Sequence, residues 1–145
     1  MATPVYGKQY IRFAETGYVA DTDSVDQFTV VSISANTEPP TISKGIAAGA
    51  HFGVVQQDVL VVDPEKATTL QRLATVATSG LLLVACDGTV TAASVGQPLE
   101  VGSATGVATE TSSGGAEVTV NGGIKPTVRQ LVNIGDVQHV MVSFS

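Results

Sequence analysis

Leu81–Cys86 has the sequence LLLVAC, and it is followed directly by Asp87-Gly88 and then by Thr89-Val90-Thr91. An Asp-Gly pair between two β-prone runs favours a two-residue turn, because these residues tolerate the positive φ that the turn needs. We therefore predict a hairpin over Leu81–Thr91. The stretch Gly80–Asn121 as a whole predicts a compact β module, because it also holds three short β-prone segments bounded by turn residues: Gly96–Val101, Gly106–Thr109 and Gly114–Val120.

The chain on both sides of this module has the same β character. In the last predicted strand, Val140, Val142 and Phe144 fall on one side, which suits a terminal strand that closes a sheet. We therefore predict a mainly β fold, a single β-sandwich or barrel-like domain. The further predicted strands are Gln27–Ser34, His51–Gln56, Val59–Val62 and a final pair, Arg129–Ile134 and Val137–Val142, around Gly135-Asp136.

One helix start interrupts the β pattern. Asp63–Glu65 (DPE) supplies an Asp N-cap, a Pro at the first helical position and a Glu in the first turn. The β-branched residues that follow disfavour a long helix. We predict a short helix near 64–72 and then a strand over Ala74–Thr78 that turns at Ser79-Gly80. An uninterrupted helix to Ala77 is the alternative interpretation.

Composition indicates one domain whose surface is partly covered. The 145 residues are 43% hydrophobic but include no Trp, so aliphatic side chains must fill the core. Only 14% of the residues are charged, against about 25% in typical soluble domains. Such a surface is expected to bind copies of itself or a partner. The alternative is a surface rich in Thr and Ser that needs no partner.

The charge distribution argues against nucleic acid as a partner. The net charge is −6, and the seven cations are scattered singly, whereas phosphate-binding proteins cluster them. The single cysteine, Cys86, excludes an intrachain disulfide and is typical of synthesis in a reducing compartment. We predict neither a signal peptide nor a membrane partner, because no basic-then-apolar leader and no apolar run of about 20 residues is present.

The N-terminal region, residues 1–27, shows no sustained periodicity but is rich in aromatics. We predict an extended arm that binds a neighbouring molecule and orders on contact, followed by a β-rich domain over 28–145. Deletion of residues 2–20 would then leave the fold intact. An ordinary first strand around Tyr10–Phe13 is the alternative. The binding candidates within the arm are Tyr6, Tyr10, Arg12, Phe13 and Tyr18.

We predict no catalytic residue, metal site or cofactor. The two histidines, His51 and His139, have no further ligands at metal-binding spacing. Cys86 ends an apolar run beside an aspartate, which is not the electropositive setting of a reactive thiol. The acidic segment that begins at Asp21 has Asp26 and Ser32 where a calcium-binding EF-hand loop needs Gly and Glu.

The order of these features resembles the head decoration (capsid cement) proteins of tailed bacteriophages, in particular the group related to the lambda-type decoration protein. The resemblance covers roughly residues 28–120 and implies a β-tulip type of fold. It is carried by Phe28–Ser32, Gly53–Gln56, the predicted hairpin Leu81–Thr91, Gly96–Leu99, Gly106–Ala108 and Gly115–Val120.

The resemblance implies a non-enzymatic protein of the virion. It would be made in the host cytoplasm, bind the major capsid protein on the outer surface of the mature capsid as a homotrimer, and stabilise the shell against internal DNA pressure. Three linked copies would engage three sites at once, so that modest contacts sum through high effective concentration. The alternative is a tail- or fibre-associated β module that binds a host surface glycan. A small enzyme assembled from distant strands is a third hypothesis, disfavoured by the few histidines and absent metal ligands.

Overall fold

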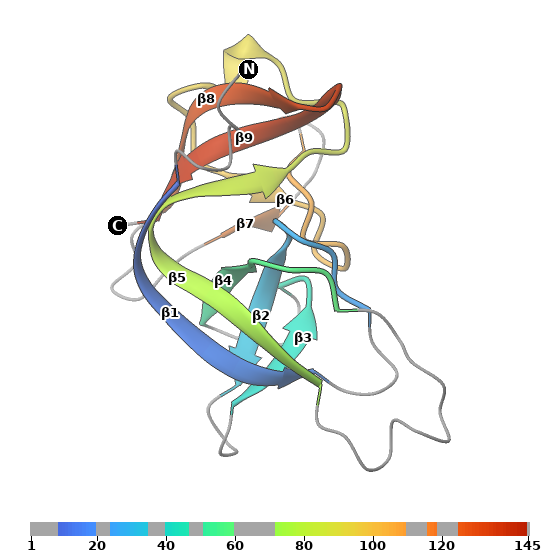
Figure 1. The fold of residues 1–145 in the computed structure, drawn as a ribbon. Helices are drawn as coiled ribbons and strands as arrows, with labels where there is room; N and C mark the ends of the chain where they lie inside the picture. The colour runs from blue at the N-terminus through green and yellow to red at the C-terminus, as the bar shows by residue number, and fades with distance from the viewer. Residues whose placement is uncertain are drawn as a thin grey trace.

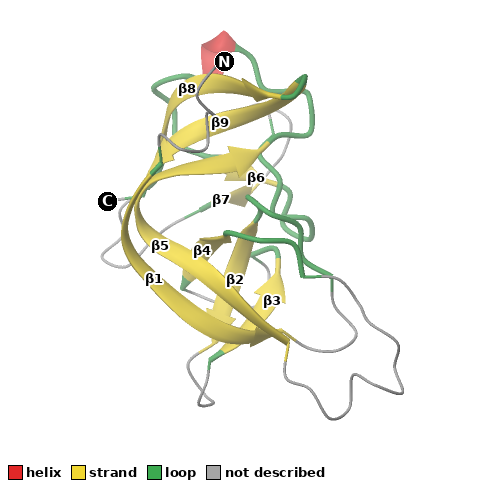
Figure 2. Ribbon diagram, in the orientation of Figure 1, coloured by secondary structure: helices red, strands yellow, loops and turns green. Residues whose placement is uncertain are grey.

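The computed structural model describes residues 9–19, 24–34, 40–46, 51–59, 72–109, 116–118 and 125–144. These residues form strands and loops, with one short 3-10 helix, η2, at Ala92–Ser94 (Figure 2). None of the described helical residues makes a helix long and apolar enough to span a membrane. The strands are β1 Tyr10–Val19, β2 Val30–Ser34, β3 Thr41–Lys44, β4 Phe52–Val55, β5 Arg72–Ala85, β6 Glu100–Val101, β7 Ala116–Glu117, β8 Thr127–Ile134 and β9 Val137–Ser143.

The main sheet has seven strands in the order β1-β3-β2-β4-β5-β9-β8. An additional antiparallel pairing of β1 with β5 closes β1, β3, β2, β4 and β5 into a ring. In Figure 1 these two long strands run side by side along one flank, and the β8–β9 hairpin lies beyond one end of the ring. The predicted mainly β, barrel-like fold is therefore confirmed.

The long strand β5 links the ring to the rest of the sheet. Its first part pairs with β1 and β4, and its last part, Leu81–Ala85, pairs with β9. Leu81 is in register with both Tyr10 of β1 and Ser143 of β9. Gly80 precedes Leu81, the residue at which the pairing of β5 changes from β1 to β9. Gly80 has φ +126°, and a Cβ there would lie 2.0 Å from the Tyr10 carbonyl oxygen. Only glycine fits where β1 approaches β5 so closely.

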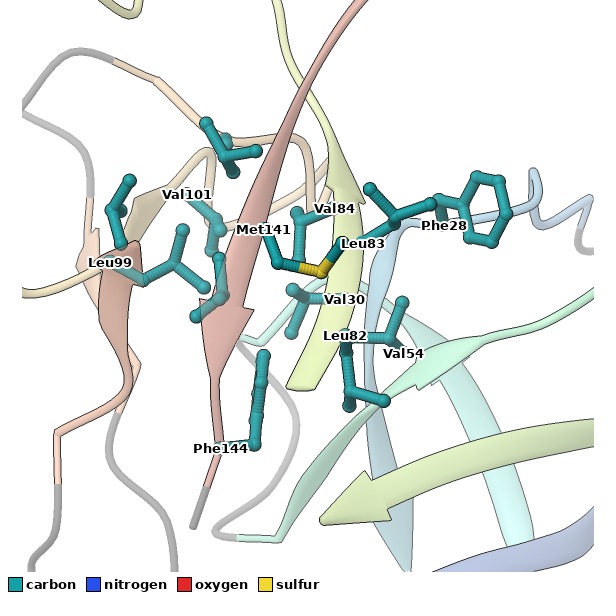
Figure 3. Close-up of a cluster of buried hydrophobic side chains, with 14 of the residues drawn as sticks. Phe28, Val30, Val54, Leu82, Leu83, Val84, Leu99, Val101, Met141 and Phe144 are labelled. Carbon is teal, nitrogen blue, oxygen red and sulfur yellow. The ribbon is translucent and has the colours of Figure 1, made fainter. Parts of the chain in front are cut away.

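The central strands are buried on both faces, which explains their consecutive valines. Val31 and Val55 belong to a cluster with residues from all five ring strands, so this cluster fills the ring. Their neighbours Val30 and Val54 point the other way, into a larger cluster with β6, β8 and β9 (Figure 3). All four valines are fully buried. A strand covered on both sides has a continuous apolar run instead of alternating polar and apolar residues.

The loop that follows β6 is hydrogen-bonded to two segments of the ring, the start of β2 and the residues after β3. The Val30 amide donates to the Gly106 carbonyl oxygen at 2.8 Å, and the Ile46 amide donates to the Ser103 carbonyl oxygen at 2.9 Å. Gly106 has φ +69°, and a Cβ there would lie 2.0 Å from the Val30 carbonyl oxygen. Glycine is therefore needed for this close approach between loop and strand.

Local turn signals produced two wrong predictions. Ser79-Gly80 does not turn, because both residues remain paired with β1 and the chain continues as β5. Asp87-Gly88 does not close a hairpin either. The Asp87 carboxylate instead accepts hydrogen bonds from the Thr89 amide at 2.9 Å and hydroxyl at 2.6 Å, a local turn that leads the chain away from β5. The last part of β5 pairs with β9 and not with Thr89–Thr91, the partner that the predicted hairpin required.

Predictions based on longer patterns compare better with the structure. The predicted strands Gln27–Ser34 and His51–Gln56 correspond to β2 and β4, and the final pair corresponds to β8 and β9 around Gly135-Asp136. The predicted helix near 64–72 lies outside the described residues except for Arg72, which already belongs to β5. An uninterrupted helix to Ala77 is wrong for the described part, which is strand.

The expected arm needs correction over residues 10–19. These residues form β1, which pairs with β5 from Tyr10 to Val19 and with β3 at Tyr18 and Val19. The alternative interpretation, a first strand, therefore describes this segment, while residues 1–8 lie outside the described part. Deletion of residues 2–20 would remove a strand of the ring and is expected to prevent folding, because the core it covers would be exposed.

Candidate functional site

An exposed apolar stretch lies on β1. Tyr10 and Phe13 are each 66% exposed and Ile11 is 42% exposed, although all three are in a paired strand. Residues 10–16 are all exposed, whereas the end of the same strand, at Val19, is fully buried. Large apolar side chains that are exposed to solvent on a paired β-strand are typical of an interaction surface.

Along the same stretch, no described strand pairs with the outer edge of β1. Its inner edge pairs with β5, whereas β3 pairs with β1 only at its last two residues. The Tyr18 amide donates to the Pro40 carbonyl oxygen at 2.7 Å on that outer side. Because backbone groups alternate along a strand, Thr16 and Ala14 direct theirs to the same side, where no described strand pairs with them. We call residues 10–16 with this edge the β1 edge.

The beginning of the β1 edge is anchored by side-chain hydrogen bonds. The Gln9 amide oxygen accepts from the Leu83 backbone amide at 2.9 Å, and the Gln9 amide nitrogen donates to Gln56 Oε1 at 3.0 Å. These contacts hold the residue before Tyr10 against the ring. The exposed stretch is therefore presented by a supported strand, which reduces the entropy lost when a partner binds.

Two charged residues on β1 have different surroundings. Glu15 Oε2 lies 3.0 Å from His51 Nε2, and Glu15 shares its side of the strand with Gly17 and Val19, which face the ring interior. This pair therefore joins β1 to the residue that precedes β4, at the end of the ring. Within the described part of the chain, Arg12 has no ion pair, so its charge faces solvent between Ile11 and Phe13.

The predicted binding residues are only partly brought together. Tyr10, Arg12 and Phe13 lie together on the β1 edge, whereas Tyr18 is half-buried and its amide bonds to Pro40. Tyr6 lies outside the described residues. Sequence reasoning missed the backbone edge that lacks a described partner, although the run Tyr-Ile-Arg-Phe indicates a strand with exposed apolar residues.

The other residues considered for chemistry have structural surroundings. Burial, followed by the charge of Asp87, raises the pKa of the Cys86 thiol to about 12, so a thiolate is disfavoured. His139 is buried, its Nδ1 donates to the Val137 carbonyl oxygen at 3.0 Å, and its ring packs edge-on against Phe28. Among the described residues, no three His, Cys, Asp or Glu side chains are grouped as metal ligands would be.

Asp87 has a perturbed carboxyl group in an exposed turn. Partial burial alone would raise its pKa, but hydrogen bonds from Thr89 and from the Thr109 side chain outweigh it and hold the pKa below the usual value. The Thr89 and Thr109 hydroxyl oxygens are themselves 3.3 Å apart. Because a hydrogen-bonded, ionised carboxylate is a poor proton acceptor, this group stabilises the turn and is unsuited to acid–base chemistry.

Comparison of the chain with protein-family models, with curated proteins and with solved structures finds no match. The assignment of a function consequently depends on the geometry of the β1 edge and on the sequence pattern.

Proposed function

We propose that this protein is a non-enzymatic capsid decoration protein of a tailed bacteriophage, which attaches to the major capsid protein through the β1 edge. The observation that carries the proposal is the pair of aromatic side chains, Tyr10 and Phe13, each 66% exposed on a strand that the ring supports from one side. A protein that works by binding needs such a surface and does not need reactive groups.

The residue types on the β1 edge suit a contact that must be strong for its size. Tyr and Arg are enriched among the residues that dominate binding free energies, and aromatic side chains bury a large apolar area. Arg12 between Ile11 and Phe13 adds a charge that can select the partner. A trimer would present three such edges, so that moderate individual affinities combine through effective concentration.

The charge of the chain supports a position on the outside of the shell. With a net charge of −6, the protein is repelled by nucleic acid and gains nothing by facing the packaged DNA. On the outer surface, a protein that bridges neighbouring capsid subunits opposes their separation when internal pressure rises. The proposed location is therefore the outer surface of the virion, after synthesis in the host cytoplasm.

Binding to capsids tests the proposal. Purified protein would be sedimented to determine its oligomeric state and then mixed with a panel of expanded tailed-phage capsids stripped of their own decoration proteins. We expect a trimer that binds one or more of these capsids and raises their melting temperature. Phe13→Ser should weaken binding at least about tenfold.

Val137→Ser provides the matched control, because Val137 is also an exposed apolar residue, 53% exposed, but lies at the start of β9. It should leave binding unchanged. Absence of binding to every capsid, or equal effects of the two variants, would contradict the proposal. Binding of an oligosaccharide that Phe13→Ser abolishes, without capsid binding, would instead support the glycan-binding alternative, since exposed aromatic rings also stack on sugars.

A further inference from the structure

The way in which a partner binds the β1 edge follows from its backbone and its charge. We infer that the edge acts as an acceptor: the capsid partner contributes an extended segment that pairs with β1 as an additional strand and places a carboxylate against Arg12. This inference rests on the proposed function, which it makes more specific. It reverses the roles expected of an arm, because this chain provides the edge and the partner provides the strand.

The backbone of β1 supports the acceptor role. One edge of the strand pairs with β5, and among the described residues the other edge is paired at Tyr18 and Val19 alone, by Pro40 and β3. Residues 10–16 therefore offer an edge without a described partner, about 23 Å long at about 3.3 Å per residue, whose register is irregular at Arg12 and Phe13. Strand addition at such an edge gains affinity from main-chain hydrogen bonds, in which Ala14 and Thr16 would take part.

The charge on the edge indicates the partner's chemistry. Arg12 is exposed and has no ion pair among the described residues, although the chain as a whole is acidic. Opposite charges on neighbouring strands stabilise their pairing, whereas like charges oppose it. A segment with an acidic residue near Arg12 is therefore favoured, and a basic segment is disfavoured.

A second copy of this chain is the alternative occupant of the edge. Antiparallel pairing of two β1 strands with Ala14 opposite Thr16 would set Glu15 against Glu15, and like charges oppose that arrangement. The register of β1 is irregular at Arg12 and Phe13, so strand alternation assigns no partner to Arg12 in such a pair. Protection of Ala14 and Thr16 from amide hydrogen exchange without any added peptide would indicate pairing with a second copy and overturn the inference.

The test uses labelled strand-forming peptides of alternating Thr and Val as probes. The first peptide carries a central Glu and the second a central Lys. The third has the sequence of the Glu peptide, but every second backbone amide is N-methylated, so that one edge of the peptide cannot donate hydrogen bonds. It is made in two versions, one for each edge. We expect the Glu peptide to bind the full chain at least tenfold more tightly than the Lys peptide. At least one methylated version should bind no better than a scrambled soluble peptide, because it cannot donate to the β1 edge.

A charge exchange gives the sharpest control. Arg12→Glu should reverse the preference, so that the Lys peptide binds more tightly than the Glu peptide. Amide hydrogen exchange should show that the Glu peptide protects Ala14 and Thr16, with unchanged protection in β8. Equal binding of all peptides, no reversal by Arg12→Glu, or protection elsewhere on the chain would overturn the inference.

Amide hydrogen exchange measured on the capsid-bound protein separates the strand-addition inference from the proposed decoration function. Capsid binding without protection of Ala14 and Thr16 would leave the decoration function standing and refute strand addition. Peptide binding with the expected charge preference, but no binding to any capsid, would support the acceptor edge and refute the decoration function.

Discussion

Replacement of Gly80 by alanine tests the close approach of β1 to β5, on which the ring depends. Gly80 has φ +126°, which an L-residue rarely adopts, and it pairs with Ile11 of β1. A Cβ at this position would lie 2.0 Å from the Tyr10 carbonyl oxygen and 3.0 Å from the Arg12 amide nitrogen. Both contacts are with backbone atoms, so no rotation of a side chain can relieve them.

The expected loss of stability has two parts. A non-glycine residue held in a sparsely populated backbone region costs on the order of 1–3 kcal/mol. Relief of the clash requires β1 to move away from β5, which weakens hydrogen bonds worth about 0.5–1.5 kcal/mol each. With about two such hydrogen bonds weakened, these contributions predict that Gly80→Ala lowers the free energy of unfolding by about 2–6 kcal/mol, a large loss for a single substitution.

Urea unfolding followed by far-ultraviolet circular dichroism provides the assay, since the chain has no Trp. Gly135→Ala is the control, because Gly135 also has a positive φ, +53°, but nothing lies within 4 Å of its Cβ position. The control should cost about 1 kcal/mol, the usual penalty of a left-handed conformation. If the two variants unfold within about 0.5 kcal/mol of each other, the clash contributes nothing and the reasoning is wrong.

Three further predictions concern the core, the thiol and the contact between Glu15 and His51. Val54→Thr and Val55→Thr should each lower the free energy of unfolding by about 1–3 kcal/mol, because both faces of β4 are buried. If either variant is as stable as the unchanged chain in urea unfolding, burial on both faces is contradicted. Cys86, with a pKa of about 12, should react with iodoacetamide at pH 8 far more slowly in the folded protein than in urea, and its rate should rise with pH beyond pH 9; equal rates would refute the raised pKa. Glu15→Gln should change the free energy of unfolding by less than about 1 kcal/mol, because Glu15 and His51 are both more than one-third exposed. A larger loss in the same urea unfolding assay would contradict this and show that the pair is needed to hold the end of the ring.

The sequence by itself determined the β class and those strands whose own residues carry the signal. Gln27–Ser34 and His51–Gln56 are rich in β-branched residues, and Gly135-Asp136 separates two such runs that pair with each other. Pairing between neighbours in sequence needs only a turn. It can therefore be inferred from local composition.

Only the tertiary structure decided how these strands close and which edge stays open. Ser79-Gly80 resembles a turn locally, but long-range pairing with β1 holds it in a strand, and β5 takes β9, not Thr89–Thr91, as its partner. The exposed residues of β1 became a candidate site because β5 pairs with one edge, while the other edge has no partner along residues 10–16 in the described part of the chain. The physical reason is that backbone pairing has almost no side-chain signature: any strand can hydrogen-bond to any other, and burial of the shared core selects the pair.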